Sequence, residues 1–364
     1  MAKKNLIVGQ SGGPTAVINS SLYGVVSEGI RQEEIGHVYG MVNGIEGFLK
    51  GTVLDFEEAL PGEKLEYLTY TPGAYLGSCR YKLPQSLEDP VYPELFRRFE
   101  EMNIGWFFYI GGNDSMDTVS KLSRYAAMIG SDIRIIGEPK TIDNDIWGTD
   151  MTFGFQSAVD IATTAIDCIH TTAYSHGRVF IVEVMGHKVG WLTLHAGIAG
   201  GADVILIPEI PYDIDAVVQA IQKRTDAGKR FSILAVAEGA ISKEDALLTK
   251  KERKAKLKNN PYPSVSYKIG AEIEERTGQE IRITVPGHTQ RGGSPCAYDR
   301  VIASRLGAAA AQLILEEKYG YMVGFKNREI IPIPLEEVAG KLKMVDPDSS
   351  IIREAKNLGI SFGV

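Results

Sequence analysis

Short apolar runs alternate with helix-length amphipathic segments along most of this chain, and no other feature constrains the fold as much. The apolar runs are rich in β-branched and aromatic residues, which is typical of buried strands. The predicted strands are Leu6–Val8, Trp106–Ile110, Ile133–Gly137, Val179–Val184, Val204–Ile207 and Ile233–Ala237. The predicted helices are Val17–Arg31, Met116–Met128, Phe155–Tyr174, Lys188–Ala199 and Asp215–Ala227. This alternation predicts an α/β fold of doubly wound parallel sheets, with ligands at the carboxyl ends of the strands.

The length of 364 residues exceeds the usual size of a single core, so we expect two domains. A break is expected near 148–154, where the first set of strands stops, and a cleft between the domains is the expected active site. The Lys- and Glu-rich stretch 242–260 is expected to be a solvated, partly helical insertion before a helix at Ser264–Thr277.

Charge and cysteine content exclude several classes of function. A formal net charge of −7 argues against a general nucleic-acid partner but leaves room for local basic pockets that bind small phosphates. The three cysteines are far apart and without metal-ligand spacing, which favours a reducing cytoplasm over a disulfide framework. The chain shows neither the apolar region of a signal peptide nor a run long enough to span a membrane.

The segment from Pro139 to Asp145, Pro-Lys-Thr-Ile-Asp-Asn-Asp, follows a predicted strand and has a composition suited to phosphoryl transfer. A hydroxyl nucleophile needs a carboxylate to take its proton, and the transferring phosphoryl group needs fixed positive charge and usually magnesium. Lys140, Asp143 and Asp145 could supply these needs. An Asp- and Asn-rich turn without chemistry is the alternative interpretation.

Three further loops accompany this segment. Gly9-Gln-Ser-Gly-Gly-Pro-Thr follows the first strand and opens a helix, where backbone N–H groups favour a phosphate. Ile110-Gly-Gly-Asn-Asp-Ser follows the second predicted strand, and Pro286-Gly-His-Thr-Gln-Arg-Gly-Gly-Ser-Pro lies near the C-terminal quarter. In order and spacing, from Gly9 to about Gly307, these motifs resemble the phosphofructokinase family.

The resemblance implies a glycolytic transferase that phosphorylates the 1-hydroxyl of fructose 6-phosphate. It also implies that the strand from Ile281 and the helix after it return to the N-terminal domain. We therefore expect a phosphate-donor domain at 1–150 plus about 286–307 and a sugar-phosphate domain at 151–285. The segment 308–364 is expected to form a C-terminal helix and tail that pack across both.

The donor is indicated by Asp114 and Lys140. ATP-using members of the family usually carry glycine at both positions, whereas pyrophosphate-dependent members usually carry Asp and Lys. A carboxylate at position 114 would crowd and repel the α-phosphate of ATP, and pyrophosphate ends before that point. Lys140 would neutralise the distal phosphate. The resemblance therefore implies reversible transfer from pyrophosphate, giving fructose 1,6-bisphosphate and phosphate.

The family also implies a role for each matching residue. Asp143 is the expected base, and Thr141, Asp145 and Arg80 are the other expected catalytic residues. The expected donor-binding residues are Gly12, Gly13, Asp114, Ser115 and Lys140. The expected sugar-phosphate residues are Arg178, Met185, Gly186, Glu238, Arg282, His288 and Arg291. Arg178 is expected to reach the site of a neighbouring subunit, which implies a homodimer or homotetramer.

Magnesium is the expected cofactor, with Asn113 and Asp114 as candidate ligands. The family usually has an acid at the position of Asn113, and an amide oxygen is a weaker ligand for a hard cation. Asp145 is then an alternative ligand. His187 also stands where the family usually has Arg.

The sequence permits other substrates and functions. Sedoheptulose 7-phosphate presents the same reactive end as fructose 6-phosphate and is an alternative acceptor, and ATP is an alternative donor. A non-catalytic regulatory subunit is disfavoured because Asp143 and Arg80 are both present. A nicotinamide dehydrogenase is disfavoured because its glycine fingerprint is missing.

Overall fold

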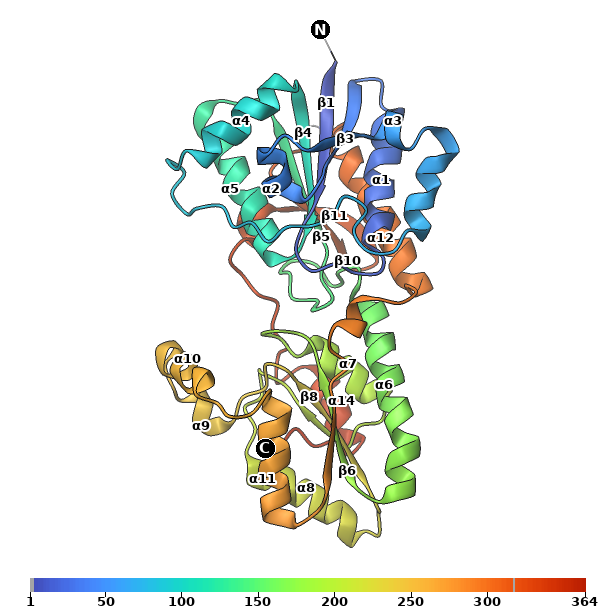
Figure 1. Ribbon diagram of the computed structural model, residues 1–364, viewed down its shortest axis with the longest axis vertical. Helices are drawn as coiled ribbons and strands as arrows, with labels where there is room; N and C mark the ends of the chain where they lie inside the picture. The colour runs from blue at the N-terminus through green and yellow to red at the C-terminus, as the bar shows by residue number, and fades with distance from the viewer. Residues whose placement is uncertain (1–2, 317) are drawn as a thin grey trace. The chain divides into compact units, whose positions relative to one another are not determined.

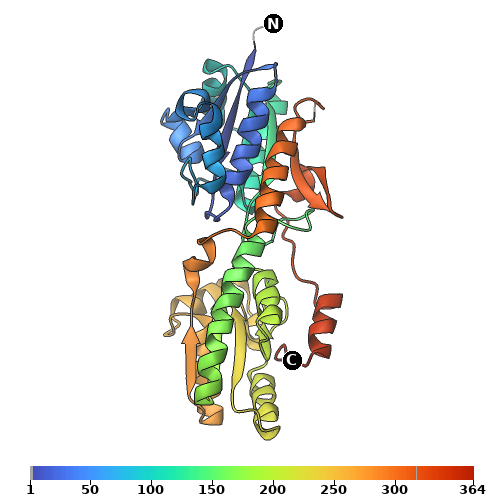
Figure 2. The ribbon, with the colours of Figure 1, turned by 90° about the vertical axis from the view of Figure 1, so that its right-hand side faces the viewer.

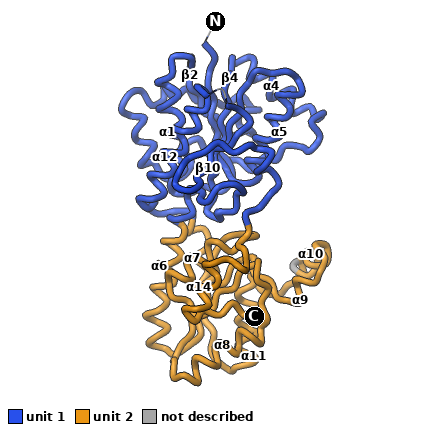
Figure 3. The backbone as a smooth tube through the Cα atoms, turned by 180° about the vertical axis from the view of Figure 1, so that it is seen from behind, with its two compact units in different colours: residues 1–157, 291–343 blue, residues 158–290, 344–364 orange. Residues whose placement is uncertain are grey.

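The computed structural model describes residues 3–316 and 318–364, and the chain divides into two compact units (Figure 3). Unit 1 comprises residues 1–157 and 291–343, and unit 2 comprises residues 158–290 and 344–364. Each unit has its own sheet (Figure 1). No helix in the described part of the chain combines the length and apolar character that crossing a membrane requires.

Unit 1 contains a seven-stranded sheet in the order β11-β10-β5-β4-β1-β2-β3. Its strands are β1 (Lys4–Gln10), β2 (Ile35–Met41), β3 (Val53–Asp55), β4 (Ile104–Gly111), β5 (Arg134–Pro139), β10 (Tyr321–Lys326) and β11 (Glu329–Pro334). The five inner strands are parallel to one another, and the two edge strands, β3 and β11, are antiparallel to them.

Helices cover both faces of this sheet because successive residues of its central strands point to opposite faces. Leu6 and Val8 of β1 join the core on one face, and Ile7 joins the core on the other. The first core includes side chains of α1 (Ile18–Arg31), α12 (Ala297–Gln312) and the 3₁₀ helix Gly62–Tyr70. The second includes α2 (Gly44–Leu49), α4 (Val91–Glu101), α5 (Asn113–Ile129) and α13 (Leu335–Val338). The short α3 (Phe56–Ala59) follows β3.

Helices α1 and α12, far apart in the sequence, lie side by side (Figure 2). Two glycines make this close approach possible. A Cβ on Gly307 would lie 2.1 Å from the backbone oxygen of Ser21, and a Cβ on Gly24 would lie 2.6 Å from that of Ser304.

Unit 2 contains a four-stranded parallel sheet in the order β7-β8-β6-β9. Its strands are β6 (Val179–Val184), β7 (Val204–Leu206), β8 (Ser232–Ala237) and β9 (Ile281–Thr284). Its helices are α6 (Phe155–His176, which begins in unit 1), α7 (Trp191–Ala199), α8 (Ile214–Asp226), α9 (Lys243–Ala246), α10 (Lys250–Lys258), α11 (Val265–Thr277) and α14 (Ser350–Asn357). One core joins the sheet to α8 and α11. The expected α/β fold with parallel sheets is confirmed.

One expectation differs from the structure in part. The strand that begins at Ile281 belongs to unit 2, because β9 pairs with β6 and its isoleucines pack against the core that includes α11. The helix after it, α12, lies in unit 1. The segment 308–364 is divided between the units: residues up to 343 belong to unit 1 and supply β10 and β11, and residues 344–364 belong to unit 2.

Candidate active site

The expected donor and catalytic residues of unit 1 follow the carboxyl ends of three adjacent strands. Gln10 at the end of β1 pairs with Ile110 of β4, and Gly111 of β4 pairs with Pro139 at the end of β5. The loops that follow these strands therefore begin side by side, as expected for a ligand site in a parallel sheet.

The glycine loop after β1 is fixed by backbone hydrogen bonds to the segment that carries Arg80. Gly12 donates its N–H to the carbonyl oxygen of Cys79 at 3.0 Å, and its own carbonyl accepts a hydrogen bond from Ser78 Oγ at 2.6 Å. Its φ of +77° lies in the left-handed region, which glycine adopts without strain. The next residue, Gly13, leaves room for a cation: a Cβ there would lie 2.4 Å from Nη1 of Arg291.

Lys140 lies beneath this loop and is only 2% exposed. Its Nζ donates a hydrogen bond to the carbonyl oxygen of Gly13 at 2.6 Å. Burial lowers the pKa of Lys140 to about 7, and the charge of Arg291 acts in the same direction, whereas Asp143 and Asp145 oppose it. Burial therefore disfavours the charged form of the amine that lies against the glycine loop. An anion bound there would favour the charged form and offset the cost of desolvation.

The expected base lies in a turn directly after Lys140. Asp143 donates its backbone N–H to Thr141 Oγ1 at 3.1 Å, and the carbonyl oxygen of Thr141 accepts a hydrogen bond from Thr152 Oγ1 at 2.9 Å. Asn144 has a left-handed φ of +53°. The Asp- and Asn-rich turn is thus present, and it places two carboxylates where both act on Lys140.

The expected donor residues of the second loop lie at the start of α5. Ser115 Oγ shares a hydrogen bond with Ser11 Oγ of the glycine loop, which joins the two loops. Asp114 forms an ion pair with Lys82 at 2.9 Å, and both side chains are more than two-thirds exposed, at 73% and 72%. Lys82 was not among the predicted site residues, because nothing in its local sequence indicates that it faces this loop.

Magnesium fits the side chains of these loops only as an ion shared with a substrate. Asn113 Nδ2 donates to the backbone oxygen of Asp145 at 3.2 Å, so this amide links α5 to the loop after β5. Asp145 and Asp114 offer carboxylate oxygens, and Mg²⁺ usually binds through one or two carboxylates together with substrate phosphates and water. The loops supply that donor set.

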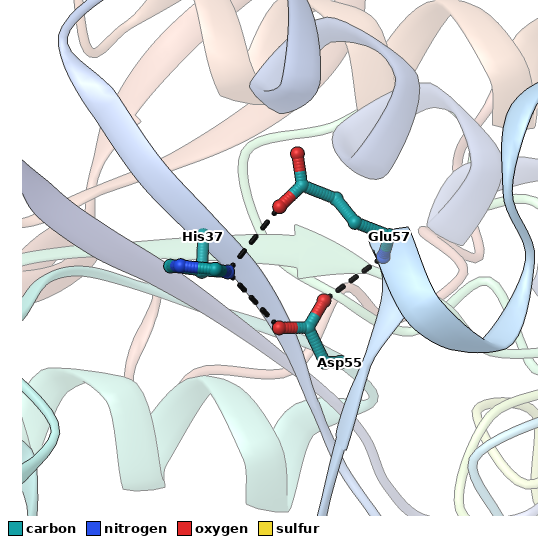
Figure 4. A group of neighbouring side chains, drawn as sticks. All are labelled: His37, Asp55 and Glu57. Carbon is teal, nitrogen blue, oxygen red and sulfur yellow. Dashed lines mark hydrogen bonds and ion pairs between the residues drawn. The ribbon is translucent and has the colours of Figure 1, made fainter.

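Among the described residues, one group of three side chains could hold a metal ion, and it lies elsewhere (Figure 4). His37 Nδ1 is 3.0 Å from Asp55 Oδ2 and 3.3 Å from Glu57 Oε2. The group lies beside the edge strand β3 and includes an imidazole nitrogen, whereas magnesium prefers oxygen ligands. It therefore does not correspond to the expected magnesium site.

Unit 2 gathers Met185, Gly186 and Glu238 at the carboxyl ends of β6 and β8. Glu238 Oε1 accepts hydrogen bonds from the backbone N–H groups of Gly186 at 3.3 Å and His187 at 2.8 Å. Gly186 has a φ of +144°, and a Cβ there would lie 2.6 Å from the carbonyl oxygen of Val189, so this turn requires glycine. Glu238 thus shapes the turn that follows β6.

Arg178 and Arg282 lie at the opposite end of the same sheet. Arg178 precedes β6, and both arginines form ion pairs with one carboxylate, that of Glu280. β6 has six residues and spans about 20 Å at ~3.3 Å per residue. The two arginines therefore lie far from Met185 and Glu238 of their own chain.

The other two expected phosphate-binding cations, His288 and Arg291, lie three residues apart on one 3₁₀ helix. His288 is exposed on the 3₁₀ helix Gly287–Arg291, beyond the carboxyl end of β9. Arg291 lies against Gly13 with the donor residues. Within one chain, Arg178 and Arg282 lie at the other end of the sheet from Met185. The expectation that Arg178, Arg282, His288 and Arg291 bind one phosphate, with Arg178 donated by a neighbouring subunit, therefore stays a prediction.

Comparison with known proteins identifies the family to which these loops belong. The family profile described as Phosphofructokinase matches residues 5–314. The chain belongs to the phosphofructokinase family. As a phosphofructokinase, it is expected to act on fructose 6-phosphate.

Two relatives of this phosphofructokinase carry names that give ATP as the donor. The chain is 42% identical to an ATP-dependent 6-phosphofructokinase of Spirochaeta thermophila, covering 97% of this chain and 96% of the relative. It is 42% identical to ATP-dependent 6-phosphofructokinase 3 of Bacteroides thetaiotaomicron, covering 97% and 98%.

Solved structures of pyrophosphate-dependent phosphofructokinases are similar to this phosphofructokinase. The one from Nitrosospira multiformis has a TM-score of 0.84 at 28% identity and is matched over 96% of this chain and 88% of that one. The one from Marinobacter aquaeolei has a TM-score of 0.80 at 31% identity, over 98% and 92%. The names agree on the sugar substrate class and differ on the donor.

Proposed function

We propose that this phosphofructokinase transfers a phosphoryl group reversibly from pyrophosphate to the 1-hydroxyl of fructose 6-phosphate. The products are fructose 1,6-bisphosphate and phosphate. The observation that carries the choice of donor is the buried amine of Lys140 against the carbonyl oxygen of Gly13. A compact polyanion bound at the glycine loop would restore the full charge of this amine, which burial otherwise disfavours.

Asp114 supports the same donor through the volume and charge of its carboxylate. It lies at the start of α5, one residue from Ser115, which contacts the glycine loop. The ion pair with Lys82 reduces the net charge of Asp114, so the steric part of the exclusion carries more weight than the electrostatic part. ATP is the second candidate donor, and the names of the Spirochaeta and Bacteroides relatives favour it.

In the proposed mechanism, Asp143 takes the proton of the attacking hydroxyl late in the reaction, as positioning supplies most of the acceleration. Thr141 orients the turn through its contact with the Asp143 N–H. Lys140 and Arg80 stabilise the charge of the transferring phosphoryl group. Asp145 and Asp114, together with the donor, would hold magnesium, which would supply positive charge to neutralise the phosphates.

The acceptor site is proposed to use two chains. Met185, Gly186, Glu238 and His288 would come from one chain, and Arg178 and Arg282 from a neighbour, because the two arginines lie at the far end of their own sheet. Sedoheptulose 7-phosphate remains an alternative acceptor, since its reactive end is the same. The proposed two-chain site makes the protein a homo-oligomer. The described cysteines are free thiols, which supports a proposed location in the cytoplasm.

The test of the donor proposal is the double variant Asp114→Gly with Lys140→Gly. We expect its activity with pyrophosphate to fall by at least about 100-fold and ATP to become a competing donor, since bulk is removed where the nucleoside end would pass. The matched control removes an exposed ion pair elsewhere in unit 1, as Lys4→Gly with Asp132→Gly. An unchanged donor preference in the Asp114 and Lys140 variant would refute the roles of these residues.

A further inference from the structure

Lys343 lies near the C-terminal end of unit 1, in a segment whose sequence shows no motif, yet it contacts the loop that carries the proposed base. Its Nζ donates three hydrogen bonds, each of 2.9 Å, to Asn144 Oδ1, the carbonyl oxygen of Thr149 and the carbonyl oxygen of Asp150. All three acceptors lie in the seven residues that follow Asp143. The side chain of Lys343 thus contacts both ends of the loop that follows Asp143.

The backbone beside Lys343 holds the same loop. Lys343 donates its own N–H to the carbonyl oxygen of Asp145 at 2.9 Å, and Leu342 forms an antiparallel bridge with Ile146. Asn144 Oδ1 also accepts a hydrogen bond from the N–H of Thr152 at 3.0 Å. The amide of Asn144 therefore connects Lys343 to the segment that supports Thr141.

We propose that Lys343 is a positioning residue for phosphoryl transfer, which fixes the turn of Asp143 and Asp145 through Asn144. The inference rests on the function proposed above, in which Asp143 takes the proton of the acceptor. Lys343 acts through other residues, since its amine is directed at protein acceptors.

The chemistry of the three acceptors requires an ammonium group. They are an amide oxygen and two carbonyl oxygens, none of which carries a charge, and an ammonium has three donors in a tetrahedral arrangement. Burial lowers the pKa of Lys343 to about 8, and the carboxylates of Asp150 and Asp145 oppose this shift. A planar guanidinium cannot direct three donors to the same acceptors, so Arg is a poor substitute at this position.

Turnover of purified Lys343→Met and Lys343→Arg, compared with the wild-type protein and with Lys341→Met, tests the proposal. Lys341 is exposed two residues away and serves as the matched control. We expect Lys343→Met to lower kcat at least about 30-fold, because a small misplacement of a reacting group has a large effect on rate. KM for each substrate should change less than about 3-fold, and Lys343→Arg should restore only part of kcat.

A double-mutant cycle with Asn144→Gly separates positioning from general stabilisation. Glycine accepts the left-handed φ of residue 144, so this variant removes the side chain of Asn144 without straining the turn. If Lys343 acts through Asn144, the double variant should be no more than about 3-fold slower than the slower single variant. The proposal would be overturned if the losses in kcat of the two single variants multiply in the double variant. It would also be overturned if folded Lys343→Met has a kcat within about 3-fold of wild type.

Failure of the proposed function would give a different result. Each ratio is taken against wild-type protein with whichever donor, pyrophosphate or ATP, supports turnover. If ATP and not pyrophosphate is the donor, the assay uses ATP, and the ratios of variant to wild-type turnover still test Lys343. If Asp143 is not the base, the Asp143→Asn variant is active.

Discussion

Two buried ionisable residues, Glu138 of β5 and Lys140 just after the strand, have pKa values that move in opposite directions. Burial raises the pKa of Glu138 to about 8 and lowers that of Lys140 to about 7. Ser21 Oγ donates a hydrogen bond to Glu138, which partly opposes the shift of the acid. In each case burial disfavours the charged form of the side chain.

Glu138 makes the stability of the protein depend on pH. Between the ordinary pKa of 4.5 and the raised value of about 8, the folded state holds more protons than the unfolded state, so stability falls as pH rises. Glu138→Gln should therefore raise the free energy of unfolding by at least about 1 kcal/mol at pH 8 and much less at pH 5. Urea unfolding at both pH values measures this, and an equal effect at the two would contradict it.

Asp143 carries the most direct chemical prediction. Asp143→Asn keeps the size of the side chain and removes its ability to take a proton, so kcat should fall at least about 100-fold. Sugar-phosphate binding and the melting temperature should stay near wild type, which calorimetry and circular dichroism would measure. Turnover close to wild type would rule out Asp143 as the base.

At the scale of elements, the packing of α1 against α12 joins the first and last parts of unit 1. The contact depends on glycine, since a Cβ on Gly307 would lie 2.1 Å from the backbone oxygen of Ser21. Backbone cannot rotate away as a side chain can, so the helices would have to separate.

Gly307→Ala should accordingly lower the free energy of unfolding by about 2 kcal/mol, although alanine favours helices more than glycine does. Arg305→Ala, at an exposed position of the same helix, is the control and should change it by less than about 0.5 kcal/mol. Chemical denaturation measures both. A stabilised Gly307→Ala variant would show that α1 and α12 are not in tight contact.

Elements with strong periodicity could be predicted from the sequence, and those defined by partners could not. The buried runs of β1, β4, β5, β6, β7 and β8 are mostly apolar, and their predictions are confirmed. The interrupted pattern of β2, Ile35-Gly-His-Val-Tyr-Gly-Met, gives no such signal. β10 depends on pairing with β5, and β11 depends on pairing with β10.

The residues of the candidate site divide in the same way, into those that belong to a sequence motif and those that do not. Motifs placed the glycine loop, the loop after β4 and the loop after β5 together. Glu280, Lys82 and Lys343 could not be predicted, because their partners are set by the folded chain and not by neighbouring sequence.

At the scale of the whole molecule, the separation of Arg178 from Met185 along β6 leads to a prediction about assembly. If sites are shared, homo-oligomers of Asp143→Asn and of Arg178→Ala should each be nearly inactive. Co-expression of the two variants should recover up to about a quarter of wild-type activity, since one of the two sites in a mixed dimer has both residues intact. A mixture as inactive as its parents, with mixed oligomers shown by mass spectrometry, would argue for sites built from one chain.

A comparison of two phosphoryl donors on the same purified enzyme tests the roles of Asp114 and Lys140. Purified wild-type protein is assayed with fructose 6-phosphate and magnesium, with pyrophosphate or ATP as the only donor. We expect a kcat/KM for pyrophosphate at least about 100-fold above that for ATP. In the proposed site, Asp114 excludes the nucleotide and Lys140 binds the shorter polyanion. Rapid turnover with ATP and none with pyrophosphate would contradict it.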